Sequence, residues 1–275
     1  MTQQTVTMTK PNVEPIQDRY IVPGLKRGLD LLQMCARQPA GLVLSDAAQT
    51  LGISRSSTFR LLYTLEKLGF VQRGADERKF FVGLQVVNLR AKAVRTDVGE
   101  TAREPMERLR AVTGMSVHLA LRDSREVVYI HSLSGQGRVT TNIGVGTRLP
   151  AHATSMGRLL LSALSDRELR ALYRNVRLEA YTNQTTTAMT KLVEQVRADA
   201  DRGYVASEGF FDSAIWSVAA PIRNQSGSVC AAISVTCPAN SVEKSQLRGP
   251  MKDRVCATAE AISAFMGYQQ PDASK

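Results

Sequence analysis

Several features that mark other classes of protein are missing from this 275-residue sequence. No uninterrupted run of about 18 apolar residues occurs, so we expect no membrane-spanning helix and no membrane partner. The four cysteines, Cys35, Cys230, Cys237 and Cys256, form no C-x-x-C pair. With only three histidines, this argues against a structural zinc site and a disulfide framework. The N-terminal segment lacks the apolar core of a signal peptide, so we expect a disordered tail over residues 1–18 of a cytoplasmic protein.

A catalytic constellation is also missing. His118, His131 and His152 are scattered along the chain. His152 lies close to Ser155, but no G-x-S-x-G turn surrounds this serine, and a serine at a helix start is commonly a cap. The segment Gly144–Leu149 does not match the G-x-G-x-x-G of dinucleotide-binding loops. We therefore expect a protein that is not an enzyme and that binds neither a metal nor a cofactor.

The sequence does have an excess of positive charge. Its 35 Lys and Arg against 25 Asp and Glu give a net charge of +10. Such a balance attracts phosphate backbones or anionic membranes, without choosing between them. Hydrophobic residues make up 43% of the chain, which is enough for one large core or two ordinary ones.

The first eighty residues predict three helices and a hairpin. A first helix is expected over about Pro23–Arg37, because apolar residues recur there at helical spacing, at Leu25, Leu29, Leu32 and Ala36. Ser45 is expected to cap a short helix over Asp46–Leu51. After a turn at a glycine, Ser54 is expected to cap a third helix that runs to about Leu68.

The third helix has two distinct faces. One is largely leucine, with Thr58, Leu61, Leu62, Leu65 and Leu68 at helical spacing. The other face is polar and aromatic, with Ser56, Arg60, Tyr63 and Lys67, flanked by Arg55 and Phe59. Such a helix suits the DNA major groove, where Arg bonds the guanine edge and Ser bonds phosphates or bases. The alternative is a small helical domain with a solvated charged face.

A hairpin follows, with strands expected over Phe70–Arg73 and Arg78–Val82. Basic residues near its tip would lie along the phosphate backbone. This order of helices and hairpin favours DNA binding over the alternative. The predicted DNA-contacting residues are Ser45, Ser54, Arg55, Ser56, Ser57, Phe59, Arg60, Tyr63, Arg73, Arg78 and Lys79.

Three segments resemble the IclR family of bacterial transcription regulators: Leu25–Gln33, Leu42–Val71 and Arg78–Val86. The resemblance implies a winged helix-turn-helix DNA-binding domain over residues 19–83 and a linker helix over residues 84–104. An apolar stripe agrees with a helix there, with an interruption expected near Gly99; it comprises Leu84, Val87, Ala91, Val94 and Val98. This helix either packs onto a domain surface or acts as a lever and dimer contact, which the resemblance favours.

The remainder predicts antiparallel strands with helices segregated around them, the pattern of an α+β domain. Strands are expected over Ser116–Leu121, Glu126–Ser132, Val139–Ile143, Val218–Ile222 and Val229–Thr236. Helices are expected over Ser155–Leu164, Asp166–Arg174, Lys191–Arg202 and about Ser241–Met266. Leu149–Leu164 and Arg202–Pro238 resemble the GAF-like effector-binding domains of the IclR family. The resemblance implies such a domain over residues 105–268, followed by a tail over residues 269–275.

The same resemblance implies a set of ligand-binding residues. Ser155 and Met156 fall where backbone amides meet a ligand carboxylate. The polar positions are Ser207, Ser217, Ser234 and Thr236, and the apolar wall positions are Thr141, Leu149 and Ile215. Trp216 lies in the same segment, near Phe210 and Phe211. Two positions depart from the family, which usually has an acidic residue near Ser207 and a glycine at Ala214.

The residues themselves leave two interpretations of this segment open. Ser234 and Thr236 are two apart on a strand and share a face, so their hydroxyls either line a wet pocket or are satisfied by the backbone. The aromatic residues either pack against a flat ligand or fill the core.

Together these observations predict a transcription regulator that binds duplex DNA. We expect an inverted-repeat operator bound by a homodimer or a dimer of dimers, because two-fold protein symmetry requires a near-palindromic site. The expected effector is a small carboxylic acid, possibly aromatic, of a catabolic pathway. The alternative is a constitutive DNA-binding regulator whose C-terminal domain only oligomerises.

Overall fold

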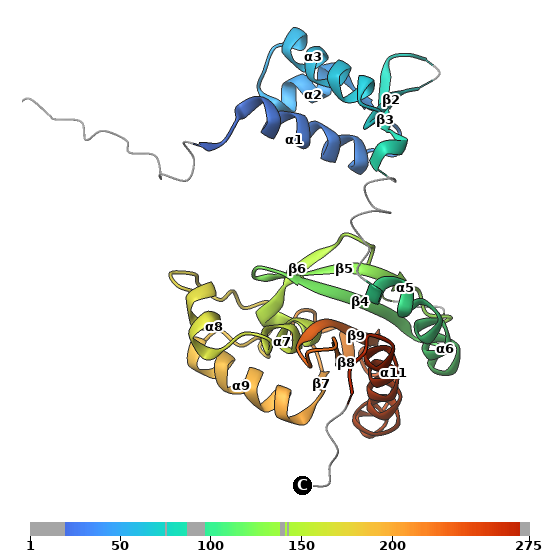
Figure 1. Ribbon diagram of the computed structural model, residues 1–275, viewed down its shortest axis with the longest axis vertical. Coiled ribbons are helices and arrows are strands. Elements are labelled where there is room, and N and C mark those ends of the chain that lie inside the picture. Colours follow the sequence, from blue (N-terminus) through green and yellow to red (C-terminus); the bar gives the residue numbers. More distant parts are fainter. Residues whose placement is uncertain (1–19, 75, 87–96, 138–140, 142, 270–275) are drawn as a thin grey trace, which may run out of the picture. The chain divides into compact units, whose positions relative to one another are not determined.

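A computed structural model describes residues 20–74, 76–86, 97–137, 141 and 143–269. The chain divides into two compact units, residues 1–93 and 94–275 (Figure 1). Each unit has its own hydrophobic core.

Three helices and a small antiparallel sheet form the described core of the N-terminal unit, and residues 84–86 begin a further helical stretch. Its helices are α1 (Pro23–Arg37), α2 (Leu44–Leu51) and α3 (Arg55–Lys67), and its strands are β1 (Leu42–Val43), β2 (Val71–Arg73) and β3 (Lys79–Val82). The strand order is β1-β3-β2, so β2 and β3 form the predicted hairpin. The strand β1, which the sequence analysis did not predict, pairs with β3. The structure confirms the predicted winged helix-turn-helix.

Some local predictions in this unit are wrong. The buried face of α1 carries Leu31 and Cys35, whereas Leu25 and Leu29 of the expected stripe are 64% and 51% exposed. Helix α2 begins two residues earlier than expected, at Leu44 after Val43, and has no side-chain cap. The Ser45 hydroxyl, expected to cap it, donates instead to Asp46 Oδ1 at 3.0 Å.

The third helix starts as predicted but ends before its last expected core residue. Ser54 caps α3, because its hydroxyl accepts a hydrogen bond from the Ser57 amide at 3.2 Å. Leu68 was expected on the buried face and is exposed. It lies at the C-cap, after the last helical residue, Lys67.

The predicted linker helix over residues 84–104 is only partly described, since residues 87–96 lie outside the described residues. Helix α5 (Asp97–Thr101) contains Gly99, and the interruption expected near Gly99 falls three residues further along the chain. The chain turns at Ala102, immediately before α6 (Arg103–Thr113). Val98 and Ala102 are buried in the core of the C-terminal unit. The segment from residue 97 therefore belongs to that unit and not to a linker.

The C-terminal unit is built on a six-stranded antiparallel sheet with the order β6-β5-β4-β9-β8-β7. The strands are β4 (Ser116–Asp123), β5 (Glu126–Leu133), β6 (Arg148–Pro150), β7 (Val205–Ser207), β8 (Ile215–Arg223) and β9 (Val229–Pro238). Four of the predicted strands are confirmed as β4, β5, β8 and β9. The fifth, Val139–Ile143, lies mostly outside the described residues. The sequence analysis missed β6 and β7, the two short edge strands.

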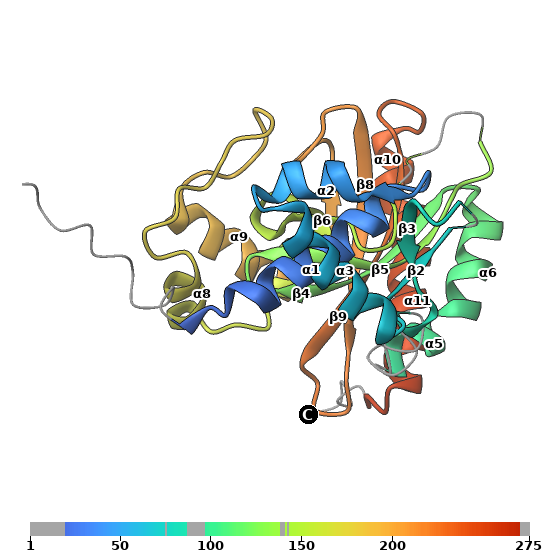
Figure 2. The ribbon, with the colours of Figure 1, turned by 90° about the horizontal axis from the view of Figure 1, so that it is seen from above.

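Helices cover both faces of this sheet (Figures 1 and 2). α6 and α11 (Lys252–Phe265) pack on one face, and α7 (Ser155–Leu161) packs on the other, backed by α9 (Met189–Arg202). The strands have a buried core on each side. Along β8, for example, Val218 and Ala220 face the α11 side and Ala219 faces the α7 side. This arrangement confirms the predicted α+β class.

The helices differ from prediction chiefly at the C-terminal end of the chain. Instead of one helix over Ser241–Met266, the structure has α10 (Lys244–Gln246), a π-helical segment (Leu247–Met251) and α11. Gly249 has non-helical dihedral angles (φ −108°, ψ −106°) and precedes Pro250, which has no amide hydrogen to donate. Within the described part of the chain, no helix is both long and apolar enough to cross a membrane.

Candidate functional sites

The outer face of α3 presents most of the predicted DNA-contacting residues to solvent. Arg55, Ser56, Ser57 and Arg60 are exposed. On the inner face Leu62 is fully buried and holds the helix against the core. The Ser54 hydroxyl lies within hydrogen-bonding distance of the hydroxyls of Ser56 (3.0 Å) and Ser57 (2.9 Å). The first turn of α3 is therefore a compact cluster of hydroxyls beside two arginines.

Two exposed aromatic rings continue this face toward the wing. The rings of Phe59 and Tyr63 lie 6.2 Å apart, and Lys67 Nζ is 5.4 Å from the centre of the Tyr63 ring. The Arg73 guanidinium of β2 lies 5.7 Å from the Phe59 ring.

The predicted wing residues do not have equivalent surroundings. Arg73 Nε donates to both carboxylate oxygens of Glu66 on α3, at 3.0 and 3.1 Å. Arg78 is exposed and Lys79 is half-buried, and in the described part of the chain neither forms an ion pair. Arg73 thus joins the wing to α3, while Arg78 and Lys79 carry charges without a carboxylate partner among the described residues.

The C-terminal unit contains a small internal cavity between the sheet, the start of α7 and the loop after β7. Its volume is about 50 Å³. Seven of the ten predicted ligand-binding residues line it: Leu149, Ser155, Ser207, Ile215, Ser217, Ser234 and Thr236. Phe210 and Phe211 also line it, as their place in the sequence suggested. The resemblance and the structure therefore point to the same region.

Three predicted ligand-binding residues do not line this cavity. Thr141 lies behind Thr236, and their hydroxyls are hydrogen-bonded to each other. The Met156 side chain is buried in the core beneath α7. Trp216 is in the core on the opposite face of the sheet, with Lys244 Nζ 5.7 Å from its ring. Side chains alternate along a strand, so Trp216 points away from the cavity that its neighbours Ile215 and Ser217 line.

Hydrogen bonding differs among the hydroxyls of the cavity. Ser155 Oγ and Ser217 Oγ are 2.9 Å apart, and Ser207 Oγ accepts from the Phe210 amide at 3.0 Å. Ser234 Oγ is buried and has no hydrogen-bond partner in the described part of the chain. Such an atom loses its bonds to water on folding without replacing them, at a cost of about 1–3 kcal/mol.

The sequence analysis missed a buried histidine beside the cavity. On β4, His118 Nε2 is 3.0 Å from Thr236 Oγ1, and His118 Nδ1 is 3.1 Å from Ser132 Oγ. Burial lowers its pKa to about 4, because the interior disfavours the charged imidazolium. The ring of Tyr129, a lining residue also missed, stands edge-on at 5.6 Å. Strand alternation was the available signal, because His118 pairs with Ser234 of β9.

The start of α7 is held rigidly. Thr154 caps the helix by accepting from the Gly157 amide at 3.1 Å. A Cβ at Gly157 would lie 2.2 Å from the Ala151 carbonyl oxygen, so only glycine fits this close approach. The amides of Ser155 and Met156 lie in the first turn, where a helix offers no acceptor of its own.

A buried ion pair lies behind the cavity wall. Arg158 on α7 contacts Asp199 on α9, with Nη2 2.6 Å and Nε 2.7 Å from Asp199 Oδ2. Its guanidinium lies 4.8 Å from the Phe210 ring. Burial lowers the pKa of Arg158 even though Asp199 opposes that shift. The pair connects the helix that begins at the cavity to the helix behind it.

A winged helix-turn-helix with an exposed basic helix, on one chain with an α+β unit that contains a small, mostly apolar cavity, defines a DNA-binding transcription regulator. Two family models match the chain: the IclR helix-turn-helix domain over residues 24–75 and the bacterial transcriptional regulator IclR C-terminal domain over residues 91–264. The chain belongs to the IclR family. Its partner is therefore DNA, and it is a regulator and not an enzyme.

Individual relatives agree with this assignment. The HTH-type transcriptional repressor AllR of Escherichia coli is 30% identical over 257 residues, which cover 93% of this chain and 94% of AllR. A putative transcriptional regulator from Rhodococcus has a solved structure with a TM-score of 0.78 at 30% identity, covering 90% of this chain and 98% of its own. An IclR homologue from Microbacterium hydrocarbonoxydans, crystallised with 4-hydroxybenzoate, has a TM-score of 0.78 at 23% identity, covering 88% of this chain and 98% of its own.

Proposed function

We propose that this protein binds an inverted-repeat operator as a homodimer or a dimer of dimers, and that a small carboxylic acid controls its binding. The acid is aromatic or otherwise apolar and belongs to a catabolic pathway. The DNA contacts come from the exposed face of α3 and from Arg78 and Lys79 of the wing. Two-fold symmetry of the protein would require two half-sites related by the same symmetry.

The observation that carries the effector proposal is the unpartnered hydroxyl of Ser234, whose residue is only 1% exposed. A ligand oxygen in the cavity would supply the missing hydrogen bond. The walls supply apolar surface from Leu149, Ile215 and two phenylalanines, which suits a flat or apolar molecule. The first-turn amides of α7 suit a carboxylate. The Microbacterium relative, with 4-hydroxybenzoate bound, supports this choice of chemistry.

The volume of the cavity sets a condition on this proposal. Ligand pockets are commonly about 300–1,000 Å³, whereas this one is about 50 Å³. Phe210 and Phe211 would have to move outward to admit an aromatic acid. Their loop is held by Thr182 and Thr185, whose hydroxyls donate to the Gly209 and Phe210 carbonyls, both at 2.6 Å. The competing interpretation is that the two phenylalanines are permanent core and the domain only oligomerises.

Self-association has support from the N-terminal unit. Helix α1 and the residues before it expose large apolar side chains on the side away from the core: Tyr20, Ile21, Val22, Leu25 and Leu29. An apolar patch of this kind commonly marks an interface. A second copy of the same chain would cover it and would create the two-fold symmetry that an inverted repeat requires.

Thermal unfolding with a panel of carboxylic acids, beginning with 4-hydroxybenzoate, tests the effector proposal. A ligand that binds only the folded state at 100 times its Kd stabilises the protein by about 2.7 kcal/mol. We expect a raised Tm in the wild type and none in Ser234→Leu, which fills the cavity. Ser226→Leu, in the exposed turn between β8 and β9, is the matched control and should respond like the wild type.

Operator binding, measured for each variant without an acid, shows that the variant is folded. It also tests the DNA-binding proposal independently of the effector proposal. If no acid changes the Tm or the DNA affinity of the wild type, the effector proposal is wrong and the constitutive regulator takes its place. Sedimentation of the wild type and of Leu25→Glu/Leu29→Glu tests the oligomeric proposal, and we expect the double variant to associate less. A wild-type protein that binds operator DNA as a monomer contradicts the proposal.

A further inference from the structure

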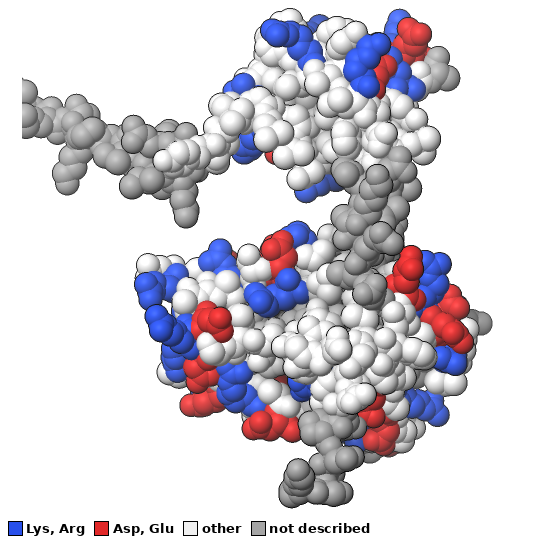
Figure 3. Space-filling model, in the orientation of Figure 1, with Lys and Arg blue, Asp and Glu red and all other residues white. Residues whose placement is uncertain are grey.

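The C-terminal unit carries a dense group of arginines far along the chain from the helix-turn-helix. Two lie in α8 (Asp166–Leu172) and two in the irregular chain that follows it, and the other two lie at the end of β4 and in the turn to β5. Five are exposed and Arg122 is half-buried. Figure 3 shows basic side chains gathered at the left edge of this unit, where Figure 1 places α8. We call this group the arginine surface: Arg122, Arg125, Arg167, Arg170, Arg174 and Arg177.

The two segments that supply the arginine surface are neighbours in space. Burial raises the pKa of Tyr173 to about 12, and the charges of Arg125 and Arg122 oppose that shift. Hydrogen bonds from Ser165 lower the pKa of Glu168, and Arg122 adds to the effect. Arg122 is therefore close enough to interact with both α8 and the residue after it.

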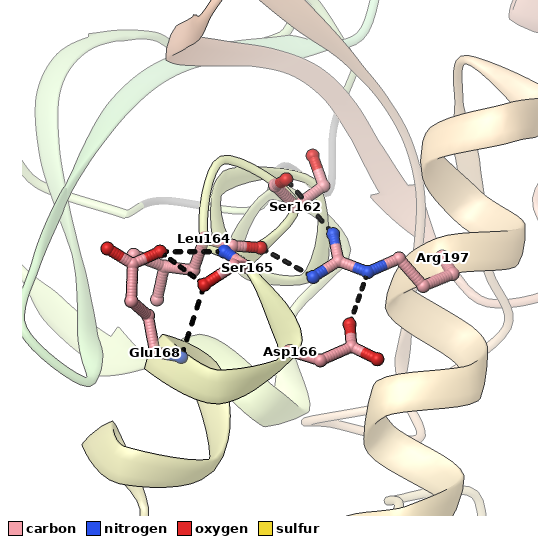
Figure 4. Close-up of polar contacts among 6 residues, drawn as sticks. All are labelled: Ser162, Leu164, Ser165, Asp166, Glu168 and Arg197. Atoms are coloured by element: carbon pink, nitrogen blue, oxygen red, sulfur yellow. Dashed lines mark hydrogen bonds and ion pairs between the residues drawn. The ribbon is translucent and has the colours of Figure 1, made fainter.

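The carboxylates near these arginines are already occupied. Asp166 Oδ1 accepts from Arg197 Nε at 2.7 Å (Figure 4). Glu168 accepts from the amide and the hydroxyl of Ser165 at 2.8 and 2.7 Å, completing a capping box. At the other segment Arg148 pairs with both Asp123 and Glu126. Within the described chain, none of the six arginines of the surface forms an ion pair.

Helix α8 is a fixed platform for its arginines. Arg197 of α9 donates to the Ser162 carbonyl at 3.2 Å and to the Leu164 carbonyl at 2.5 Å, just before α8 begins (Figure 4). Leu169 and Tyr173 are buried on its inner side. The outward-facing guanidiniums therefore lie on a backbone that is capped, clamped and packed.

The chemistry of the surface fits phosphate. All six residues are arginine, whose planar guanidinium binds phosphate oxygens in a bidentate manner. Large apolar side chains are missing from the outer side of α8, whereas protein interfaces usually have an apolar or aromatic centre. Interfaces with DNA are more polar and far more positive. One strand of duplex DNA presents a phosphate about every 3.4 Å along its axis, so a surface with several guanidiniums can contact more than one phosphate at once.

We propose that the arginine surface is a second DNA-binding site, which grips the phosphodiester backbone of duplex DNA without reading its sequence. All six of its residues belong to the C-terminal unit, so the surface is separate in the chain from the helix-turn-helix. Its contribution adds to the affinity supplied by α3 and the wing and makes binding to longer DNA more dependent on salt.

Full-length protein and a random-sequence duplex of about 60 base pairs provide the test. The measurement is the affinity by fluorescence anisotropy between about 50 and 200 mM salt. Arg170→Gln/Arg174→Gln removes two charges from the surface. Arg103→Gln/Arg108→Gln removes two charges from exposed positions on α6 of the same unit and is the matched control. Both pairs are also made in an Arg55→Ala/Arg60→Ala background, which weakens the helix-turn-helix.

Each phosphate contact contributes about 0.9 to the slope of log affinity against log salt. We expect the surface variant to lower the slope by about two, and to abolish the binding that remains in the Arg55→Ala/Arg60→Ala background. The control pair should change neither the salt slope nor the binding that remains in the Arg55→Ala/Arg60→Ala background. Equal effects of the two pairs would show a net-charge effect only and overturn the proposal. An unchanged slope with lost regulation of a reporter gene would also overturn it, in favour of an acidic protein partner.

Discussion

Arg73 of the wing and Glu66 of the recognition helix form an ion pair, with Arg73 Nε 3.0 Å from Glu66 Oε1. The guanidinium also lies 5.1 Å from the ring of Phe80, a core residue. The pair therefore fixes the wing relative to α3. Both side chains are about 30% exposed, and solvent screening limits such a pair to about 0–1 kcal/mol.

This geometry separates the roles of Arg73 and Lys79, which the sequence alone treated as equivalent. We expect Arg73→Gln to lower the free energy of unfolding by about 1 kcal/mol and to change the salt slope of DNA binding little. We expect Lys79→Gln to lower that slope by about one unit with little effect on stability. Chemical denaturation and anisotropy titrations measure the two quantities, and the opposite pattern would restore Arg73 as a phosphate contact.

Arg60 is the best residue of α3 on which to test base contact. It is exposed, and its charge has no carboxylate partner among the described residues. We expect Arg60→Ala to weaken operator binding by about 1–3 kcal/mol and to relax sequence preference at one position. Lys26→Ala, on α1 and paired with Asp30, serves as the control. The measurement is the affinity of the wild type, Arg60→Ala and Lys26→Ala for an operator selected from random DNA. Unchanged affinity in a folded Arg60→Ala protein excludes a base contact.

Trp216 is a poor reporter of the cavity because it faces the other core. We expect an aromatic acid that binds beside Phe211 to leave Trp216 emission almost unchanged. Phe211→Trp in a Trp216→Phe background places the only indole in the cavity wall and should show saturable quenching. If wild-type Trp216 is quenched and the relocated tryptophan is not, the ligand binds elsewhere.

His118 makes stability depend on pH. Its folded pKa of about 4 is below the ordinary value of 6.5, so the unfolded chain takes up a proton that the folded protein does not accept. The stability from keeping His118 neutral is complete above pH 6.5 and is lost as the pH falls toward 4. A shift of this size corresponds to about 3 kcal/mol.

Denaturation of the wild type and His118→Gln across this pH range checks the prediction. The advantage of the wild type should shrink by about 3 kcal/mol as the pH falls from 7 to 4. Direct titration by NMR gives a second measurement. An imidazole that titrates near 6.5 in the folded protein would contradict the assignment.

Elements with strong local chemistry were predictable from the sequence. Ser54 before a leucine-backed helix, and the Asn224–Gly227 turn between two apolar runs, both gave correct boundaries. The edge strands β6 and β7 are three residues each, and only pairing with β5 and β8 defines them. A glycine followed by a proline is a clear helix-breaking signal, and Gly249–Pro250 does interrupt the helix. The helical spacing of the apolar residues around it had nevertheless favoured one continuous helix.

The candidate site was predictable in place but not in detail. Seven of the residues that the family resemblance suggested as ligand-binding line one cavity, whereas side-chain alternation along β8 turns Trp216 away from it. The volume of the cavity depends on where Phe210 and Phe211 pack. Sequence spacing carries no information on that packing, so the near closure of the cavity was not foreseen.

A cavity that is too small at rest for the proposed ligand makes binding depend on how often its loop moves outward. The apparent Kd of any ligand equals its intrinsic Kd divided by the fraction of molecules whose loop is open, so opening in about 1% of molecules weakens binding about 100-fold. Thr182 and Thr185, which hold the loop from outside the cavity, therefore influence that fraction without touching a ligand. If an acid controls the protein as proposed, substitution at Thr185 would shift the acid concentration at which it responds and leave the choice of acid unchanged.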